Sequence, residues 1–166
     1  GMELEPTVEN FLDVPKIANK NKLYHATLSE NIEIDSKGNL VFRPEWHDTV
    51  GRATTWFTPI PRGGTKPGKE KGDPSAEYWL ANYINKKNPY GKDSKIIEVD
   101  KSALPEMIDL GGGEIVSKTK RGEPFKIPKD KYTVFSISDP KASIYKLPIE
   151  HMKYSYSVKN DRHMLS

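Results

Sequence analysis

The stretch Leu23-Tyr24-His25-Ala26-Thr27 predicts a β-strand that carries a histidine at its centre and a hydroxyl two residues later. The segment Ser29-Glu30-Asn31-Ile32 follows directly and is typical of a helix start, with Gly38 as the expected stop. A strand of this kind delivers an imidazole to a turn, where the ring could hold a ligand hydroxyl. The alternative is a core strand whose histidine is half-buried for packing reasons.

Length and composition indicate one domain in a chain of 166 residues. We expect an N-terminal arm over residues 1–21 and a single domain over residues 22–166. The chain has 12 Gly and 13 Pro, an excess that favours a turn-rich β or α+β fold over a helical bundle. The absence of cysteine excludes disulfides, thiolate metal sites and cysteine catalysis. A net charge of +3 does not indicate nucleic-acid binding, although it permits an anionic ligand.

The apolar runs of the chain are all shorter than the ~18 residues that a bilayer span requires. The N-terminus also lacks the apolar region of a signal peptide. We therefore expect a cytoplasmic protein or an exported effector that makes no membrane contact. The sequence does not indicate an oligomeric state.

The pattern along the chain places helices mainly in the first half and strands mainly in the second. Asp73 and Pro74 are typical of a helix start, and the apolar residues that follow recur at the three-and-four spacing of one helix face. A second short helix is expected over 102–110, and further strands are expected over 53–58, 95–100, 114–118 and 132–137. We therefore expect an α+β fold with a bent or split, mostly antiparallel sheet and a few short helices.

Apart from two prolines, the segment 61–73 contains no apolar residue, and it carries Arg62, Lys66 and two further lysines. It is either a solvated loop or a lid over a phosphate-bearing ligand. The spacing of a phosphate-binding P-loop is missing. His47 lies beside Asp48, but no second pair of ligands at helical spacing accompanies it, so we expect no metal site.

Three short motifs resemble the ADP-ribosyltransferase-like superfamily, in the His-Tyr-Glu branch shared by diphtheria toxin and the poly(ADP-ribose) polymerases. They are Tyr24-His25-Ala26-Thr27, then Thr55-Trp56-Phe57-Thr58 with Ser75-Ala76-Glu77-Tyr78, and finally Glu123 shortly before an Ile-Pro step. The resemblance spans roughly residues 22 to 137 as scattered motifs. It implies a single catalytic-type α+β domain with a split sheet, and NAD as substrate.

The first motif, by this resemblance, would bind the nicotinamide end of NAD. His25 would hydrogen-bond a hydroxyl of the nicotinamide-side ribose. The backbone of Ala26 would hold the nicotinamide amide, at a position where the family usually has Gly. The Thr27 hydroxyl would support the turn that follows.

The remaining site residues are also carried over by the resemblance. Trp56, where the family has Tyr, and Tyr78 would enclose the nicotinamide ring, while Arg62 and Lys66 would meet the diphosphate. Trp56 and Tyr78 could instead be core aromatics.

Glu123 would stabilise the positive charge that develops on the ribose and orient the acceptor. Glu98 and Glu114 are rivals for this role, since both lie in or near expected strands. Glu123 could instead be a surface residue of a turn.

The resemblance implies an enzyme that transfers ADP-ribose from NAD to a protein or nucleic-acid acceptor, or hydrolyses NAD, as bacterial or phage toxin-type effectors do. An alternative is a non-catalytic binding module whose aromatic side chains and basic loop contact a partner. A third is a small basic nuclease that uses His25 and Glu123 as an acid–base pair, against which the low net charge argues.

Overall fold

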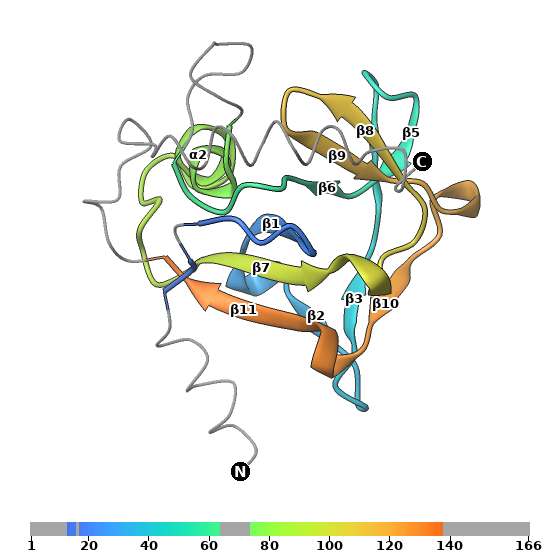
Figure 1. Ribbon diagram of the computed structural model, residues 1–166, viewed down its shortest axis with the longest axis horizontal. Helices are drawn as coiled ribbons and strands as arrows, with labels where there is room; N and C mark the ends of the chain where they lie inside the picture. Colours follow the sequence, from blue (N-terminus) through green and yellow to red (C-terminus); the bar gives the residue numbers. More distant parts are fainter. Residues whose placement is uncertain (1–12, 16, 64–73, 138–166) are drawn as a thin grey trace.

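Strand β1 (Lys22–Leu28) pairs antiparallel with β7 (Ser94–Asp100), and β7 pairs antiparallel with β11 (Tyr132–Ser136). These three strands form the lower layer in Figure 1. The computed structural model describes residues 13–15, 17–63 and 74–137. Within the expected arm, Val14 is buried and its N–H donates to the Ser136 carbonyl at 3.3 Å, so this part packs against β11.

A second sheet has the order β6 (Trp56–Phe57), β9 (Glu114–Ser117), β8 (Met107–Gly111), with all pairings antiparallel. It lies above the first sheet in Figure 1. The two sheets are joined where Tyr24 in β1 and Thr58 after β6 exchange backbone hydrogen bonds of 2.8 and 2.9 Å. The strand order therefore runs from β8 through β9, β6, β1 and β7 to β11.

Two smaller sheets complete the described strands. One has the order β10 (Phe125–Ile127), β3 (Leu40–Phe42), β2 (Glu33–Ile34), and the other pairs β4 (Glu45–His47) with β5 (Arg52–Thr54). Short 3-10 turns connect the strands, at Ser29–Asn31 (η1), Lys101–Ala103 (η3), Lys120–Gly122 (η4) and Lys129–Lys131 (η5).

The β1 sheet is buried on both faces, and the alternation of side chains along β1 follows from this. Leu23 belongs to a core cluster with Phe42, Phe57 and Ile97. Its neighbour Tyr24 belongs to a second cluster on the opposite face. His25 lies two residues after Leu23 and therefore faces the first cluster.

The α-helix of the described residues, α2 (Ala76–Trp79), is four residues long and continues into a π-helical turn, η2 (Leu80–Ile84). Ser75 caps it, because its hydroxyl accepts a hydrogen bond of 3.0 Å from the Tyr78 N–H. Ala76 and Leu80 pack in the second cluster, which fixes this segment against β1. The sequence predicted the apolar face but placed the cap at Asp73, two residues too early.

The expected α+β fold of ADP-ribosyltransferase type is wrong. Over the described residues the structure is mostly β, with 40% strand and 18% helix, several small separate sheets and one short α-helix. The segment after β1 forms η1 and then β2, because the β-branched Ile32 and Ile34 favour extended backbone. The segment expected to be helical over 102–110 ends as η3 before Pro105 and continues as β8.

Several expectations lie outside the described residues. These are most of the arm over 1–21, most of the basic loop including Lys66, and the tail after residue 137. Across the part of the chain that the structure describes, helices are all too short or too polar to cross a bilayer.

We expect Phe57→Ala to lower the free energy of unfolding by about 3–5 kcal/mol, because Phe57 is fully buried in the first cluster and its removal leaves a cavity. Urea unfolding measures this change. The control Leu110→Ala alters an exposed side chain of β8 and should change stability by less than about 0.5 kcal/mol. Equal losses in both variants would contradict the assignment of the core.

Candidate functional site

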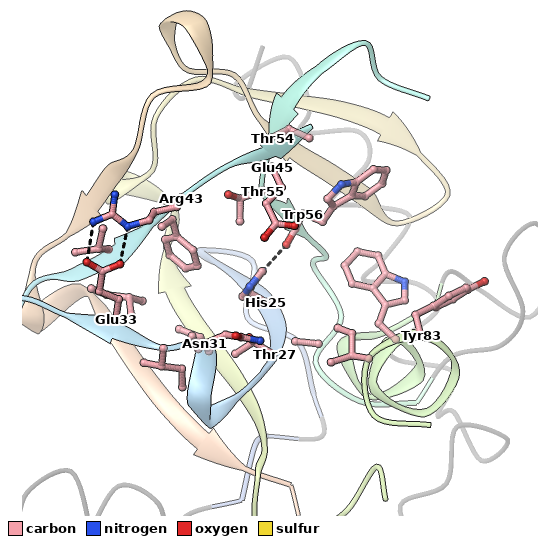
Figure 2. A pocket seen from close by; sticks show the side chains of 18 of the residues that line it. His25, Thr27, Asn31, Glu33, Arg43, Glu45, Thr54, Thr55, Trp56 and Tyr83 are labelled. Carbon is pink, nitrogen blue, oxygen red and sulfur yellow. Dashed lines mark hydrogen bonds and ion pairs between the residues drawn. The ribbon is translucent and has the colours of Figure 1, made fainter. Parts of the chain in front are cut away.

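A cavity of about 920 Å³ opens beside the middle of β1. Side chains from β1, β3, β4, β6, the α2–η2 segment and the start of β9 line it (Figure 2). Its volume is within the range of small-molecule and cofactor sites. Of the residues predicted for the site, it brings together His25, Ala26, Thr27 and Trp56.

His25 lies between two aromatic rings and beside a backbone carbonyl. Its ring centroid is 5.1 Å from that of Phe42 and 5.4 Å from that of Phe57. Its Nδ1 is 2.7 Å from the Trp56 carbonyl oxygen. Because a carbonyl oxygen only accepts, Nδ1 carries the proton in this contact.

The imidazole is neutral near pH 7, because burial lowers the pKa of His25 below its usual 6.5, against a smaller opposing effect of the Trp56 carbonyl. The ring is partly exposed because it faces the cavity, but the phenyl rings around it remove most of its hydration. With Nδ1 protonated, Nε2 has a lone pair. His25 therefore offers an acceptor, which suits a ligand hydroxyl.

The backbone of Ala26 offers a donor and an acceptor at an open strand edge. The N–H and C=O of Tyr24 both point toward Thr58. Alternate residues of a strand direct their N–H and C=O groups to the same edge. The N–H and C=O of Ala26 therefore point to the same edge of β1 as those of Tyr24. Within the described ranges, no hydrogen-bond partner of Ala26 is recorded on this edge. The methyl group of Ala26 packs in the second cluster, and the residue also lines the cavity.

Aromatic side chains form one wall of the cavity. The Trp56 ring lies edge-on to that of His47 at 5.2 Å and to that of Trp79 at 6.4 Å. Tyr83 also lines the cavity and is 63% exposed. Tyr78, predicted to stack on the ligand, is instead 5% exposed and does not line the cavity.

The helical geometry explains why Tyr78 is displaced. Trp79 and Tyr83 are four residues apart and therefore share a face, whereas Tyr78 precedes Trp79 by about 100° of rotation. The motif Ser75-Ala76-Glu77-Tyr78 drew attention to Tyr78. The three-and-four spacing of the apolar residues after Pro74 includes Trp79 and Tyr83 and is the better signal.

Glu114 is the carboxylate of β9 that lines the cavity. It directly follows Gly111, Gly112 and Gly113, whose φ angles of 83°, 64° and 80° make the turn from β8 into β9. Glycine adopts this left-handed backbone without steric cost. The triple glycine thus forms the turn that sets the position of Glu114.

The other two glutamates considered for this role lie elsewhere. Glu123 is exposed, follows the turn η4 and does not line the cavity. Glu98, in β7, accepts a 2.9 Å hydrogen bond from the Tyr24 hydroxyl and also lies outside the lining. The distance of Glu123 to the Ile-Pro step carries no information on the direction of its side chain.

Arg62 is buried away from the cavity rather than exposed on a loop. It is 2% exposed, and its Nη2 is 3.5 Å from Oε2 of Glu77. Glu77 also accepts hydrogen bonds of 2.8 Å from the Gly63 N–H and from the Tyr90 hydroxyl. Arg62 is thus held in a buried ion pair outside the cavity lining.

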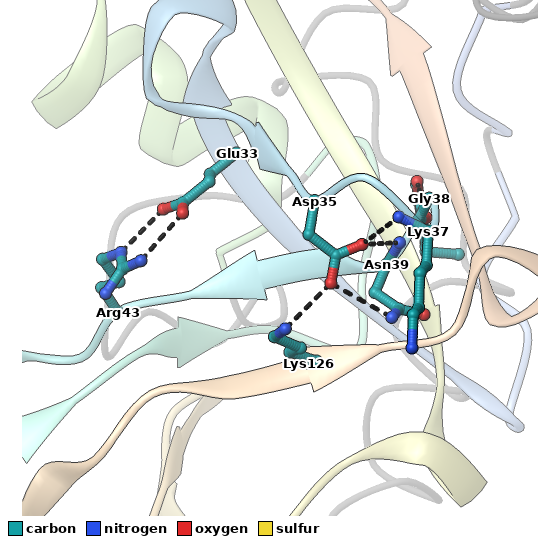
Figure 3. Close-up of polar contacts among 8 residues, drawn as sticks. Glu33, Asp35, Lys37, Gly38, Asn39, Arg43 and Lys126 are labelled. Atoms are coloured by element: carbon teal, nitrogen blue, oxygen red, sulfur yellow. Dashed lines mark hydrogen bonds and ion pairs between the residues drawn. The ribbon is translucent and has the colours of Figure 1, made fainter.

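Arg43 is a cation of the cavity lining that the sequence did not single out. Its Nε and Nη2 donate hydrogen bonds of 2.7 and 2.8 Å to the two carboxylate oxygens of Glu33 (Figures 2 and 3). Glu33 lies on β2 and Arg43 directly follows β3, so the β2–β3 pairing brings them together. The spacing of ten residues across a strand pair gives no recognisable motif in the sequence.

Comparison of the chain with protein-family models, with curated proteins and with solved structures found no match. Over the described ranges, His, Asp and Glu side chains nowhere gather in threes as a metal ion would require.

We expect the pH dependence of stability to reveal the neutral His25. Because the folded-state pKa is lowered, the unfolded chain binds a proton first as pH falls below 6.5, and the free energy of unfolding decreases. In His25→Gln this decrease should be missing between pH 7 and pH 5. Chemical denaturation at each pH measures it.

Subtracting the pH profile of His25→Gln from that of the wild type removes the contribution of other titrating groups to the free energy of unfolding. Asp35, for example, is held ionised mainly by Lys126, and its lowered pKa affects stability only below its usual value of 3.8. Identical pH profiles for both proteins would show that His25 is not held neutral by the fold.

Proposed function

We propose that the cavity binds the nicotinamide end of NAD and breaks the bond between nicotinamide and ribose, passing ADP-ribose to an acceptor or to water. The observation that carries this proposal is the convergence of His25, Trp56 and Glu114 on one cavity. They come from β1, β6 and β9, which are far apart in the sequence. The proposal keeps the expected chemistry but assigns the carboxylate to Glu114.

Recognition of the nicotinamide uses groups of fixed direction. A carboxamide has one C=O and one NH₂, which match the N–H and C=O of Ala26 on the open edge of β1. The ring packs against the Trp56 indole, which supplies apolar contact area at little entropic cost. A hydroxyl of the attached ribose then donates to Nε2 of His25.

The reaction places positive charge on the ribose ring. As the bond from C1′ to the nicotinamide nitrogen breaks, its electron pair leaves with nicotinamide and C1′ becomes cationic. The Glu114 carboxylate stabilises this charge. An acceptor O–H or a water molecule then attacks C1′, and its proton passes to Glu114.

The alternative is a non-catalytic module that binds a nicotinamide-like ligand in the same cavity. Trp46, which is 64% exposed on β4 between the cavity-lining Glu45 and His47, is a feature that a partner-binding surface would use. The two functions differ only in whether bound NAD is cleaved.

We expect Glu114→Gln to reduce nicotinamide release from NAD by about 10²-fold or more, because an amide neither stabilises the cation nor accepts the proton. Chromatography of the products measures release. Nicotinamide should still raise the melting temperature of the variant, because it binds only the native state.

The matched control is Glu123→Gln, which removes the same charge from an exposed turn and should release nicotinamide at the wild-type rate. Loss of turnover in Glu123→Gln with normal turnover in Glu114→Gln would contradict the assignment. A wild-type protein that nicotinamide stabilises but that leaves NAD intact would be the binding module. A wild type that neither ligand stabilises would contradict both functions.

A further inference from the structure

We infer that Arg43 binds the diphosphate of the dinucleotide and that Glu33 competes with the diphosphate for Arg43, which sets the affinity of the site. This inference rests on the proposed function and adds to it a residue for the anionic half of the ligand. It assigns to the Glu33–Arg43 pair a role that none of the sequence motifs indicated.

The charge of the cavity lining leads to Arg43. Among the described residues, it is the one Lys or Arg that lines the cavity, whereas Glu33, Glu45 and Glu114 also line it. A diphosphate would meet repulsion from these carboxylates unless a cation compensated it. Arg62 is buried with Glu77, so it does not supply that charge.

The position of Arg43 fits the order of groups in a dinucleotide, where the ribose lies between nicotinamide and the phosphates. Arg43 directly follows Phe42, whose ring contacts His25. In Figure 2, His25 lies between the Glu33–Arg43 pair on one side and Trp56 and Tyr83 on the other. A ligand whose ribose contacts His25 and whose ring contacts Trp56 would direct its diphosphate toward Arg43.

The geometry of the ion pair explains the competition. Glu33 holds Arg43 through two parallel hydrogen bonds of 2.7 and 2.8 Å, and a phosphate binds a guanidinium in the same forked manner. The Glu33 carboxylate thus occupies the place that a phosphate oxygen pair would take. Because the side chains are 62% and 46% exposed, the pair contributes little to stability and can exchange partners.

The ionisation of both partners supports this arrangement. The hydrogen bond to Arg43 lowers the pKa of Glu33, and Glu33 raises the pKa of Arg43. Glu33 therefore remains a full negative charge at neutral pH. A diphosphate must displace it and also overcome its repulsion.

The test compares two ligands that the protein does not turn over, ADP-ribose with a diphosphate and nicotinamide without one, by calorimetric titration. Arg43→Gln should weaken ADP-ribose binding about tenfold or more, because a charge-assisted bidentate contact is lost. Glu33→Gln should strengthen ADP-ribose binding severalfold. Nicotinamide affinity should be the same in all proteins.

Two variants control for the change in net charge. Lys131→Gln removes a partly exposed cation that pairs with Asp100, outside the cavity lining. Glu106→Gln removes an exposed carboxylate that pairs with Lys118. Both should bind ADP-ribose as wild type does at physiological salt.

The outcomes separate this inference from the proposed function. If nicotinamide binds but Arg43→Gln and Glu33→Gln leave the affinity for ADP-ribose unchanged, the inference is wrong. That result would not contradict the proposed nicotinamide site. If nicotinamide does not bind, the proposed function fails, and inorganic pyrophosphate then tests the anion site alone. Pyrophosphate binding that Arg43→Gln abolishes would support the inference, and no pyrophosphate binding by wild type would overturn it.

Discussion

The two backbone hydrogen bonds between Tyr24 and Thr58 are the contact on which the site depends. They join the β1 sheet to the β6 sheet and so bring strands from both halves of the chain around one cavity. Because the pairing ends at Thr58, β1 continues toward Leu28 with one edge open. The same contact therefore holds the sheets together and leaves the Ala26 backbone available to a ligand.

The first core cluster sets the electrostatic character of the cavity. Phe42 and Phe57 lie against the His25 ring and disfavour its protonated form. Charge in the cavity lining comes instead from other strands, with Glu114 on β9, Glu45 on β4 and the Glu33–Arg43 pair on and beside β2 and β3.

The sequence predicted the parts of the fold that local pattern determines. The β-branched and aromatic runs predicted the positions of β1, β7, β9 and β11 to within about two residues. The alternation of side chains along β1 also places His25 on the same face as Leu23. The helices were overestimated, because short polar segments after a strand were interpreted as helix starts when they form single 3-10 turns. Local propensity does not distinguish these two outcomes.

The parts of the site that depend on side-chain direction could not be predicted. Glu123 and Glu114 are both glutamates near a strand, and only the turn at Gly111–Gly113 determines which one reaches the cavity. Arg62 was interpreted as a loop cation because its partner Glu77 lies beyond the basic segment. Pairings between distant residues of this kind are fixed by the tertiary fold.

The most direct measurement is a crystal structure of Glu114→Gln with NAD bound, since slow turnover would preserve the ligand. We expect the nicotinamide ring to lie against Trp56, its carboxamide to bind the N–H and C=O of Ala26, and a ribose hydroxyl to lie within hydrogen-bond distance of His25 Nε2. NAD bound elsewhere, or in the cavity with the Ala26 edge unoccupied, would contradict this expectation.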